Sequence, residues 1–258
     1  MKRIFDYPEI PMSIACGLVF AIAVAIGIIV VKRYLHGRVH GDAPANEVVN
    51  TTLSVFSLFY GILLGLLVVG AYDNYSNLSG VVSNESSAVA NLYRNASYFP
   101  EPTGSQLKRS LGDYAQQVVD HSFAEQARGI RPRGEFPMID EFAKTLNAFE
   151  PRTASQQNLQ AETLRGFSTL LELRHDRLSS TDTGLPPTLW WIVILGAVIT
   201  LILICLLDYP LRGQLIFGCM LAFFIGTVIF VIASQEHPFS GFNRVGPEEL
   251  QYLINLVR

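Results

Sequence analysis

Four stretches of the chain carry no charged side chain, and this feature constrains the fold more than any other. They cover residues 12–31, 48–72, 185–207 and 213–235. A helix that rises about 1.5 Å per residue needs roughly 20 residues to cross the hydrocarbon core of a bilayer, so each stretch is long enough. We therefore predict an all-helical membrane protein with four transmembrane helices in two hairpin pairs.

The composition agrees with a chain that lies partly in lipid. Hydrophobic residues make up 50% and charged residues 16% of the sequence. The net charge of −3 and the lack of a basic stripe argue against nucleic-acid binding. Cys16, Cys205 and Cys219 all fall inside the uncharged stretches. We interpret them as small apolar residues, not as a disulfide framework or a metal site.

The sequence divides into four predicted segments. Residues 1–72 hold the first transmembrane pair, 73–184 form a helical extramembrane domain, 185–235 form the second hairpin, and 236–258 form a C-terminal tail. The first pair is expected to be joined by a loop at 32–47 and the second by a tight turn at 208–212. Apolar residues recur every three or four positions around 107–118, 136–149 and 164–178, which predicts three helices in the extramembrane domain.

The charges of the short loops favour one orientation in the membrane. Lys32, Arg33 and Arg38 lie in the first loop and Arg212 in the second, whereas the N-terminal segment has only Lys2 and Arg3. By the positive-inside rule, the two loops face the cytoplasm and the extramembrane domain faces outward.

One face of the second uncharged stretch is made of small or polar residues. Projected at 100° per residue, seven positions fall within a sector of about 80°. They are Asn50, Ser54, Ser57, Gly61, Gly65, Val68 and Tyr72. If the helix continues past Tyr72, the same sector reaches as far as Ser97, although the segment 73–77 is poor in helix-forming residues and could end it.

Two interpretations of this face compete. Gly61 and Gly65 are spaced like a helix-packing element, and Gly218, Ala222 and Gly226 repeat the pattern in the fourth stretch. The alternative is a pore lining, because hydroxyls and glycines give a wettable wall without fixed charge. In the second interpretation, Leu64 and Val68 form an apolar constriction and Tyr72 marks the mouth.

Several function classes are disfavoured. No ionisable residue lies within any uncharged stretch, which argues against a proton-coupled transporter. Phosphate-binding loops, nucleophile elbows and zinc-protease motifs are missing from the sequence, so we expect no enzyme activity and no cofactor. Two hypotheses remain: a subunit of an oligomeric channel, or a membrane-anchored interaction or sensor protein that does not conduct.

Three sequence segments carry recognisable motifs. They are Asn84-Glu85-Ser86-Ser87 with Leu92-Tyr93-Arg94, then Leu185-Pro186 with Trp190 and the run 195–200, and finally His237-Pro238-Phe239 with Gly241, Val245 and Pro247. Together these segments resemble the bestrophin-like domain family of bacterial and plant membrane proteins. Where the family usually has an acidic residue and a tryptophan, this chain has His121 and Ser122.

The resemblance implies kinship to bestrophins, which are oligomeric anion channels with four transmembrane helices and a pore lined by the second. It also implies a homo-oligomer in the bacterial inner membrane with inorganic ions and the lipid bilayer as partners. Bestrophins place their large domain in the cytoplasm, opposite to the orientation that the charges favour. The sequence shows no dense acidic cluster like their calcium clasp, so we expect no calcium gating of that kind.

Glu85 is the first of three further candidates. It is expected to form a structural ion pair with the extramembrane domain; the alternative is an electrostatic ring around an oligomer axis. His36 and His40, with Asp42 nearby, have a spacing that could hold a metal on a helix, but a solvated turn is the expected role.

The tail is the third candidate. Glu236, His237, Pro238 and Phe239 follow the last uncharged stretch. They form either an interfacial cap and turn or a segment that folds back on the domain near the pore mouth.

Overall fold

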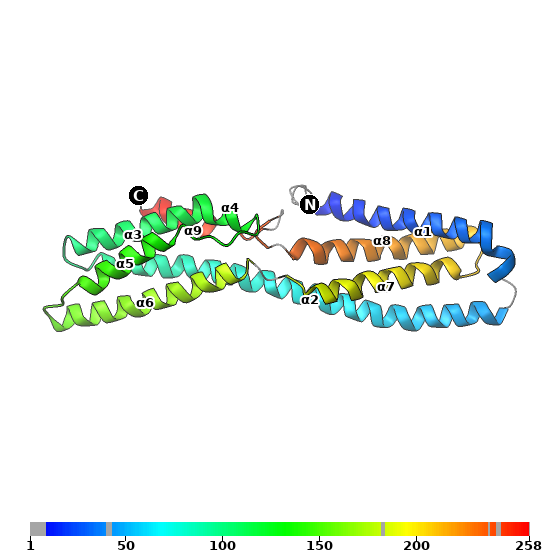
Figure 1. Cartoon of the computed structure of the whole chain (residues 1–258), viewed down its shortest axis with the longest axis horizontal. Helices are drawn as coiled ribbons and strands as arrows, with labels where there is room; N and C mark the ends of the chain where they lie inside the picture. The colour runs from blue at the N-terminus through cyan, green and yellow to red at the C-terminus, as the bar shows by residue number, and fades with distance from the viewer. Residues whose placement is uncertain (1–8, 40–42, 182–183, 237, 241–243, 258) are drawn as a thin grey trace. The chain divides into compact units, whose positions relative to one another are not determined.

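Every regular element in the described part of the chain is a helix (Figure 1). The computed structural model describes residues 9–39, 43–181, 184–236, 238–240 and 244–257. The elements are α1 (Glu9–Val39), α2 (Ala43–Ala96), α3 (Thr103–Gln117), the π-helical turn η1 (Val118–Ser122), α4 (Phe123–Gln126), α5 (Phe136–Ala148), α6 (Ala154–Ser179), α7 (Pro187–Leu206), α8 (Leu211–Gln235) and α9 (Glu248–Val257). The all-helical prediction is confirmed, and α1, α2, α7 and α8 are long and apolar enough to cross a membrane.

The described chain divides into two compact units. Unit 1 contains the described residues up to Asp73 together with Gly184–Glu236, and unit 2 contains residues 74–181 and the described residues from 238 onward. The boundary falls inside α2, so this one helix contributes a segment to each unit.

In unit 1, α1 and α8 pack closely through glycines. A Cβ atom added to Gly218 would lie 3.1 Å from Cδ1 of Ile28 and 3.4 Å from Cγ1 of Val24. One added to Gly226 would lie 3.0 Å from the carbonyl oxygen of Cys16. The small-residue pattern of the fourth stretch is therefore a packing element within the chain.

Helix α2 meets α7 at a buried tyrosine. The Tyr60 hydroxyl donates a hydrogen bond of 2.8 Å to the carbonyl oxygen of Val193. Its ring lies against Gly196, where an added Cβ atom would overlap the ring. This contact fixes which face of α2 is turned toward the core of unit 1.

The turn between α7 and α8 is held by residues from the other two helices of unit 1. Asn46 of α2 accepts a hydrogen bond of 2.8 Å from the backbone N–H of Asp208 and donates one of 3.3 Å to its carbonyl oxygen. Lys32 of α1 donates to the carbonyl oxygen of Tyr209, and its Nζ lies 3.9 Å from the Asp208 carboxylate. Lys32 therefore has a structural partner as well as a charge that bears on orientation.

Unit 2 has one apolar core. It is built from the second half of α2, from α3, α5 and α6, and from the C-terminal segment, with Leu92, Leu107, Phe142, Leu146 and Leu170 among its most buried members. The C-terminal segment contributes Phe239, Val245 and Leu250 to the same core.

The structure corrects one prediction and resolves one open alternative. The loop expected at 32–47 is wrong over most of its length, because α1 runs to Val39 and α2 begins at Ala43. A helix need not end where its apolar segment ends when good helix formers such as lysine, arginine and leucine follow. The segment 73–77 also stays helical: Ala71 and Leu78 on either side of it are buried in their own units, and such packing overrides weak local propensity.

Gly196→Ala is expected to destabilise unit 1, because the new methyl group would displace the Tyr60 ring. Overpacking of this kind costs about 1–3 kcal/mol. Thermal unfolding in detergent measures the effect. Gly70→Ala is the matched control, since a Cβ atom there meets nothing within 4 Å. An unchanged melting temperature for Gly196→Ala would contradict the packing described.

Candidate functional site

The small and polar face of α2 lies at the edge of unit 1. Asn50, Ser54, Gly61, Gly65 and Tyr72 are all exposed in the single chain. The Ser54 hydroxyl donates a hydrogen bond of 2.8 Å to the Asn50 carbonyl oxygen, which leaves its lone pairs free to accept. Most of the predicted pore-lining positions are thus open to whatever surrounds the chain in its assembled state.

Gly61 and Gly65 differ from Gly218 and Gly226 of α8. A Cβ atom added to either would meet nothing within 4 Å, whereas one added to Gly218 or Gly226 would meet α1 at 3.1 Å or less. No described residue of the same chain packs against the two α2 glycines. Helix packing within one chain therefore does not account for them.

The remaining predicted positions face inward to different degrees. Leu64 is only 5% exposed and belongs to an apolar cluster with Tyr60, Val193 and Ala197. Ser57 and Val68 are half-buried. The placement of Leu64 favours a core role, so Val68 is the better-placed apolar side chain at the edge of the face.

In unit 2 the same sector of α2 lies at the border of the core. Ser86 is buried, Ser83, Ala90 and Tyr93 are half-buried, and Ser79 and Ser97 are exposed. On another side of this segment, Asn84, Ser87, Asn91 and Asn95 line a surface pocket of about 570 Å³ together with residues of α6. Sequence reasoning missed this amide row, although its helical spacing was visible.

A buried cluster of charges links α2 to α6 within unit 2. Arg177 is 0% exposed, and its guanidinium donates to Glu85 at 2.6 Å, to Glu135 at 2.8 Å and to the side-chain oxygen of Gln126 at 2.7 Å. Arg174 donates to the second Glu135 oxygen at 2.6 Å. Two arginines thus face two carboxylates, and their charges balance.

Neutral groups complete the cluster. The Tyr114 hydroxyl donates to Glu85, and the Phe123 ring lies 5.7 Å from the Arg177 guanidinium carbon. Gln126 also donates to the Arg177 carbonyl oxygen at 3.0 Å. Buried charges are tolerated only when they are paired and hydrogen-bonded in this way.

The environment shifts the pKa values of three residues of the cluster. Burial by itself would raise the pKa of Glu135, but the positive charges of Arg177 and Arg174 and the hydrogen bonds to the carboxylate together outweigh it, so that the pKa of Glu135 is lowered overall. Burial likewise opposes the charge of Arg177, but the negative charges around it, that of Glu85 foremost, and its hydrogen bond to Glu85 together outweigh burial and raise the pKa of Arg177. Burial, reinforced by the negative charge of Glu85, raises the pKa of Tyr114. Glu135 and Arg177 are therefore ionised and the Tyr114 phenol is neutral at neutral pH.

The predicted ion pair of Glu85 with the extramembrane domain is confirmed, and its partner is Arg177. A carboxylate that is fully buried against Arg177 does not face an oligomer axis, which disfavours the alternative of an electrostatic ring. Sequence reasoning missed Arg177 itself. The sequence did contain an indication of it, because Arg177 occupies a position of α6 where the spacing of apolar residues predicts a buried side chain.

The residues after α8 are divided between the units. In unit 1, Glu236 accepts a hydrogen bond of 3.0 Å from the Trp190 indole N–H. In unit 2, the Phe239 ring lies edge-on to Phe123 at 6.0 Å, and the Pro238 carbonyl oxygen accepts from the Val245 N–H at 2.8 Å. Phe239 therefore packs against unit 2, and the position of the tail near a pore mouth stays a prediction. His237 lies outside the described residues.

Among the described residues, no group of three or more histidine, cysteine, aspartate or glutamate side chains could hold a metal ion. His40 and Asp42 lie outside the described residues, and only the helical backbone of His36 is described.

The fold and the four apolar helices define an all-helical membrane protein. The model of the Bestrophin-like domain family matches residues 18–250. The chain therefore belongs to this family, as the sequence motifs predicted. A search of curated protein sequences found no match.

Solved structures share the fold. A single-substitution variant of a bacterial bestrophin homologue from Klebsiella pneumoniae aligns with a TM-score of 0.68 at 13% identity, over 96% of this chain and 97% of that chain. A second variant from the same organism gives 0.64 at 15%, over 97% and 100%. A variant described as a membrane protein gives 0.66 at 13%, over 97% of each chain. Family and fold together support a channel-type membrane protein.

Replacing Arg177 by methionine is expected to destabilise the protein by about 3–5 kcal/mol, because Glu85 and Glu135 would be left as buried, unpaired carboxylates. Arg165→Met is the matched control on the same helix. Arg165 pairs with Glu162 at 3.0 Å, but both side chains are exposed, so the expected cost is about 0–1 kcal/mol. Chemical denaturation followed by circular dichroism measures both. Equal losses in the two variants would refute the role of the cluster.

Glu135 is expected to make the stability of unit 2 depend on acidity. Because its pKa is lowered in the folded state, its contribution is present above the ordinary value of 4.5 and is lost as the pH falls below that value. In the wild type, the denaturation midpoint should fall steeply as the pH is lowered from neutral to values below the ordinary glutamate range. The slope should be shallower in Glu135→Gln, which is also less stable at neutral pH. Parallel profiles would contradict this assignment.

Proposed function

We propose that this chain is a subunit of a homo-oligomeric ion channel whose water-filled path is lined by α2. The observation that carries the proposal is the exposed, unpacked face around Gly61 and Gly65 on a helix that is otherwise apolar in unit 1. One helix cannot enclose a path, so several copies must bring this face to a common axis.

The chemistry of the face suits ions better than a larger solute. Asn50 and Ser54 offer dipoles without a fixed charge, and the glycines bring the helix backbone close to the path. Dipoles and pore width set the selectivity of such a path. The kinship to bestrophins favours anions as the conducted species.

In this proposal the exposed members of the face line the path and Val68 narrows it. Val68 is half-buried at the border of the face, so a ring of such side chains can extend partly into the path. Leu64 supports this position from behind, within the core of unit 1. The chain lies in the bacterial inner membrane, where α1, α2, α7 and α8 each cross the bilayer.

The second hypothesis is a membrane-anchored interaction or sensor protein. The same open glycines favour it if the α2 helices of two copies cross at Gly61 and Gly65 and exclude water. The number of copies in the oligomer separates the two hypotheses. Conduction requires a ring of three or more copies around α2, whereas a dimer is sufficient for two α2 helices that cross and exclude water.

Val68→Ala is expected to increase the conductance of the purified protein in a planar bilayer several-fold, because it removes two methyl groups from the narrow point. Val69→Ala is the matched control: the chemical change is identical, but the side chain points about 100° away around the helix. It is expected to leave the current unchanged.

Absence of current from the wild type and from Val68→Ala would refute the channel. An effect of Val69→Ala alone would show that a different sector of α2 lines the path.

A further inference from the structure

One loop of unit 2 exposes basic and large apolar side chains together. This basic loop covers residues 127–136, from the end of α4 to the first residue of α5. Ile130 is 53% exposed and Phe136 is 65% exposed. Arg128, Arg131 and Arg133 of the same loop are exposed as well. Single exposed apolar residues are common on proteins, but two of them among three arginines make an amphipathic surface.

The charges of Arg131 and Arg133 are not neutralised within the described part of unit 2. The one carboxylate of the basic loop, that of Glu135, is buried and paired with Arg174 and Arg177. Among the described residues, the side chains of Arg131 and Arg133 have no ion pair and no hydrogen bond. A negatively charged partner would therefore complement this surface, whereas the same loop of a second copy would be repelled by it.

The backbone holds Ile130 in its exposed position. Gly129 has a φ of 69°, and its N–H donates to the Gln126 carbonyl oxygen at 2.8 Å. The N–H of Ile130 donates to the Glu125 carbonyl oxygen at 3.0 Å. These two bonds form a Schellman motif, in which the residue at the place of Ile130 usually packs against the residue at the place of Glu125. Glu125 is not apolar, so this contact is not available to Ile130.

Both ends of the basic loop are held by the end of α6. Gln126, just before the loop, donates to the Arg177 carbonyl oxygen at 3.0 Å and to the Thr181 hydroxyl oxygen at 2.9 Å. Near the other end, Glu135 accepts from Arg177 at 2.8 Å. Helix α7 begins at Pro187, six positions after Thr181. A segment of that length spans at most about 20 Å.

A second connection leads to the same end of unit 2. The ring of Phe123 in α4 lies 6.0 Å from that of Phe239, which is four positions after the last residue of α8. Helices α7 and α8 are apolar enough to cross a membrane. The headgroup layer adds about 5–8 Å to the hydrocarbon core, and screened attraction reaches about 8–10 Å further at physiological ionic strength. The chain therefore tethers the basic loop within reach of lipid headgroups.

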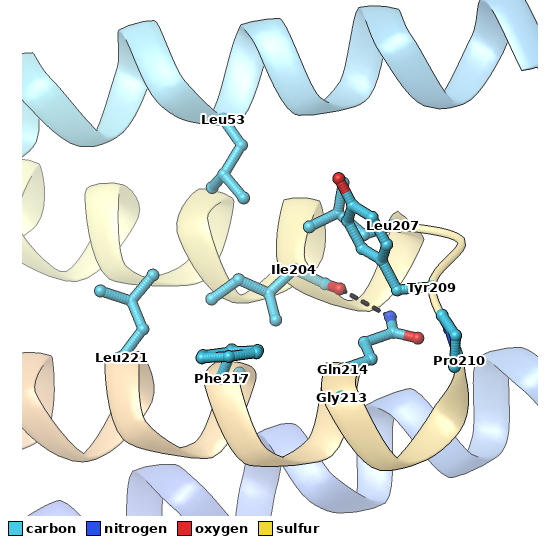
Figure 2. A pocket seen from close by; sticks show the side chains of 10 residues that line it. Leu53, Ile204, Leu207, Tyr209, Pro210, Gly213, Gln214, Phe217 and Leu221 are labelled. Carbon is cyan, nitrogen blue, oxygen red and sulfur yellow. Dashed lines mark hydrogen bonds between the residues drawn. The ribbon is translucent and has the colours of Figure 1, made fainter.

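Charge distinguishes the basic loop from the apolar pocket of unit 1. Figure 2 shows this pocket of about 490 Å³, where α7 turns into α8. Leu53, Phe217 and Leu221 contribute to its apolar wall. Gln214, also in the wall, donates a hydrogen bond of 2.9 Å to the Ile204 carbonyl oxygen. Acyl chains and the apolar side chains of a second copy suit that wall equally, whereas unpaired arginines favour a surface of negative charges.

We propose that the basic loop docks on the surface of an anionic lipid bilayer. In this arrangement Arg131 and Arg133 donate to lipid phosphates, and Ile130 and Phe136 enter the boundary between headgroups and acyl chains. Basic segments next to a transmembrane helix are attracted to anionic lipids, and buried apolar side chains add to the binding. The proposal is independent of ion conduction.

The test uses the full-length protein in lipid nanodiscs, with one fluorophore on an introduced cysteine in a background without Cys16, Cys205 and Cys219. The label is placed at Ile130→Cys or, as the matched control, at Tyr98→Cys. Tyr98 is also exposed, but it follows α2, whose last residue lies about 16 Å beyond Glu85 along the helix axis.

The discs contain phosphatidylglycerol or phosphatidylcholine with the same acyl chains, and the same small fraction of a lipid with a nitroxide quencher on its headgroup. Quenching of the label at position 130 is expected to be several-fold stronger in phosphatidylglycerol than in phosphatidylcholine. High salt should weaken this preference, because it screens the attraction. The label at position 98 should be quenched weakly and equally in both lipids.

Arg131→Gln combined with Arg133→Gln is expected to abolish the preference of the label at position 130 for phosphatidylglycerol. Arg152→Gln combined with Arg165→Gln is the matched control, because it removes the same charge from two exposed arginines further from the basic loop and should leave the preference unchanged. All four side chains are exposed, so both variants should fold as the wild type does.

Equal quenching at position 130 in the two lipids would overturn the proposal, and so would a preference that survives Arg131→Gln with Arg133→Gln. A label at position 130 with blue-shifted emission but no quenching in either lipid would also overturn it, since a second copy of the chain would then cover the loop.

Discussion

The continuity of α2 is the constraint on which the rest of the structure depends. One unbroken helix of 54 residues supplies a core face to each of two units. In unit 1 the hydrogen bond from Tyr60 to the Val193 carbonyl fixes the rotation of this helix. In unit 2 the pairing of Glu85 with Arg177 does the same. Because each contact is buried, α2 cannot turn about its axis in either unit without losing it.

This fixed rotation determines where the small and polar face of α2 lies. With Tyr60 and Leu64 turned inward, Gly61 and Gly65 are presented at the surface of the chain. The same spacing of small residues in α8 lies against α1 and leaves no space. One sequence pattern therefore has two uses in one protein, and only the neighbouring helices distinguish them.

The sequence was sufficient to predict much of the fold. Uncharged length located the four apolar helices, and periodicity located α3, α5 and α6, because both signals are local. The joining loop was mispredicted since the end of an apolar segment was taken as the end of a helix. The ion pair of Glu85 was anticipated, but Arg177 was not, because the sequence does not show which distant charges meet in a core. The burial of Leu64 and the pocket at Gln214 also depend on contacts between helices that are far apart in the chain.

We infer that water reaches the small and polar face of α2, around Gly61 and Gly65, in the assembled protein. The most direct measurement is cysteine scanning of residues 50–72 in a background without Cys16, Cys205 and Cys219, with a charged thiol reagent that does not enter lipid. We expect rapid modification at Ser54, Gly61 and Gly65, and slow modification at Phe59 and Leu66, whose exposed side chains would contact lipid or another copy. Gly61 and Gly65 positions as unreactive as Leu66 would contradict it.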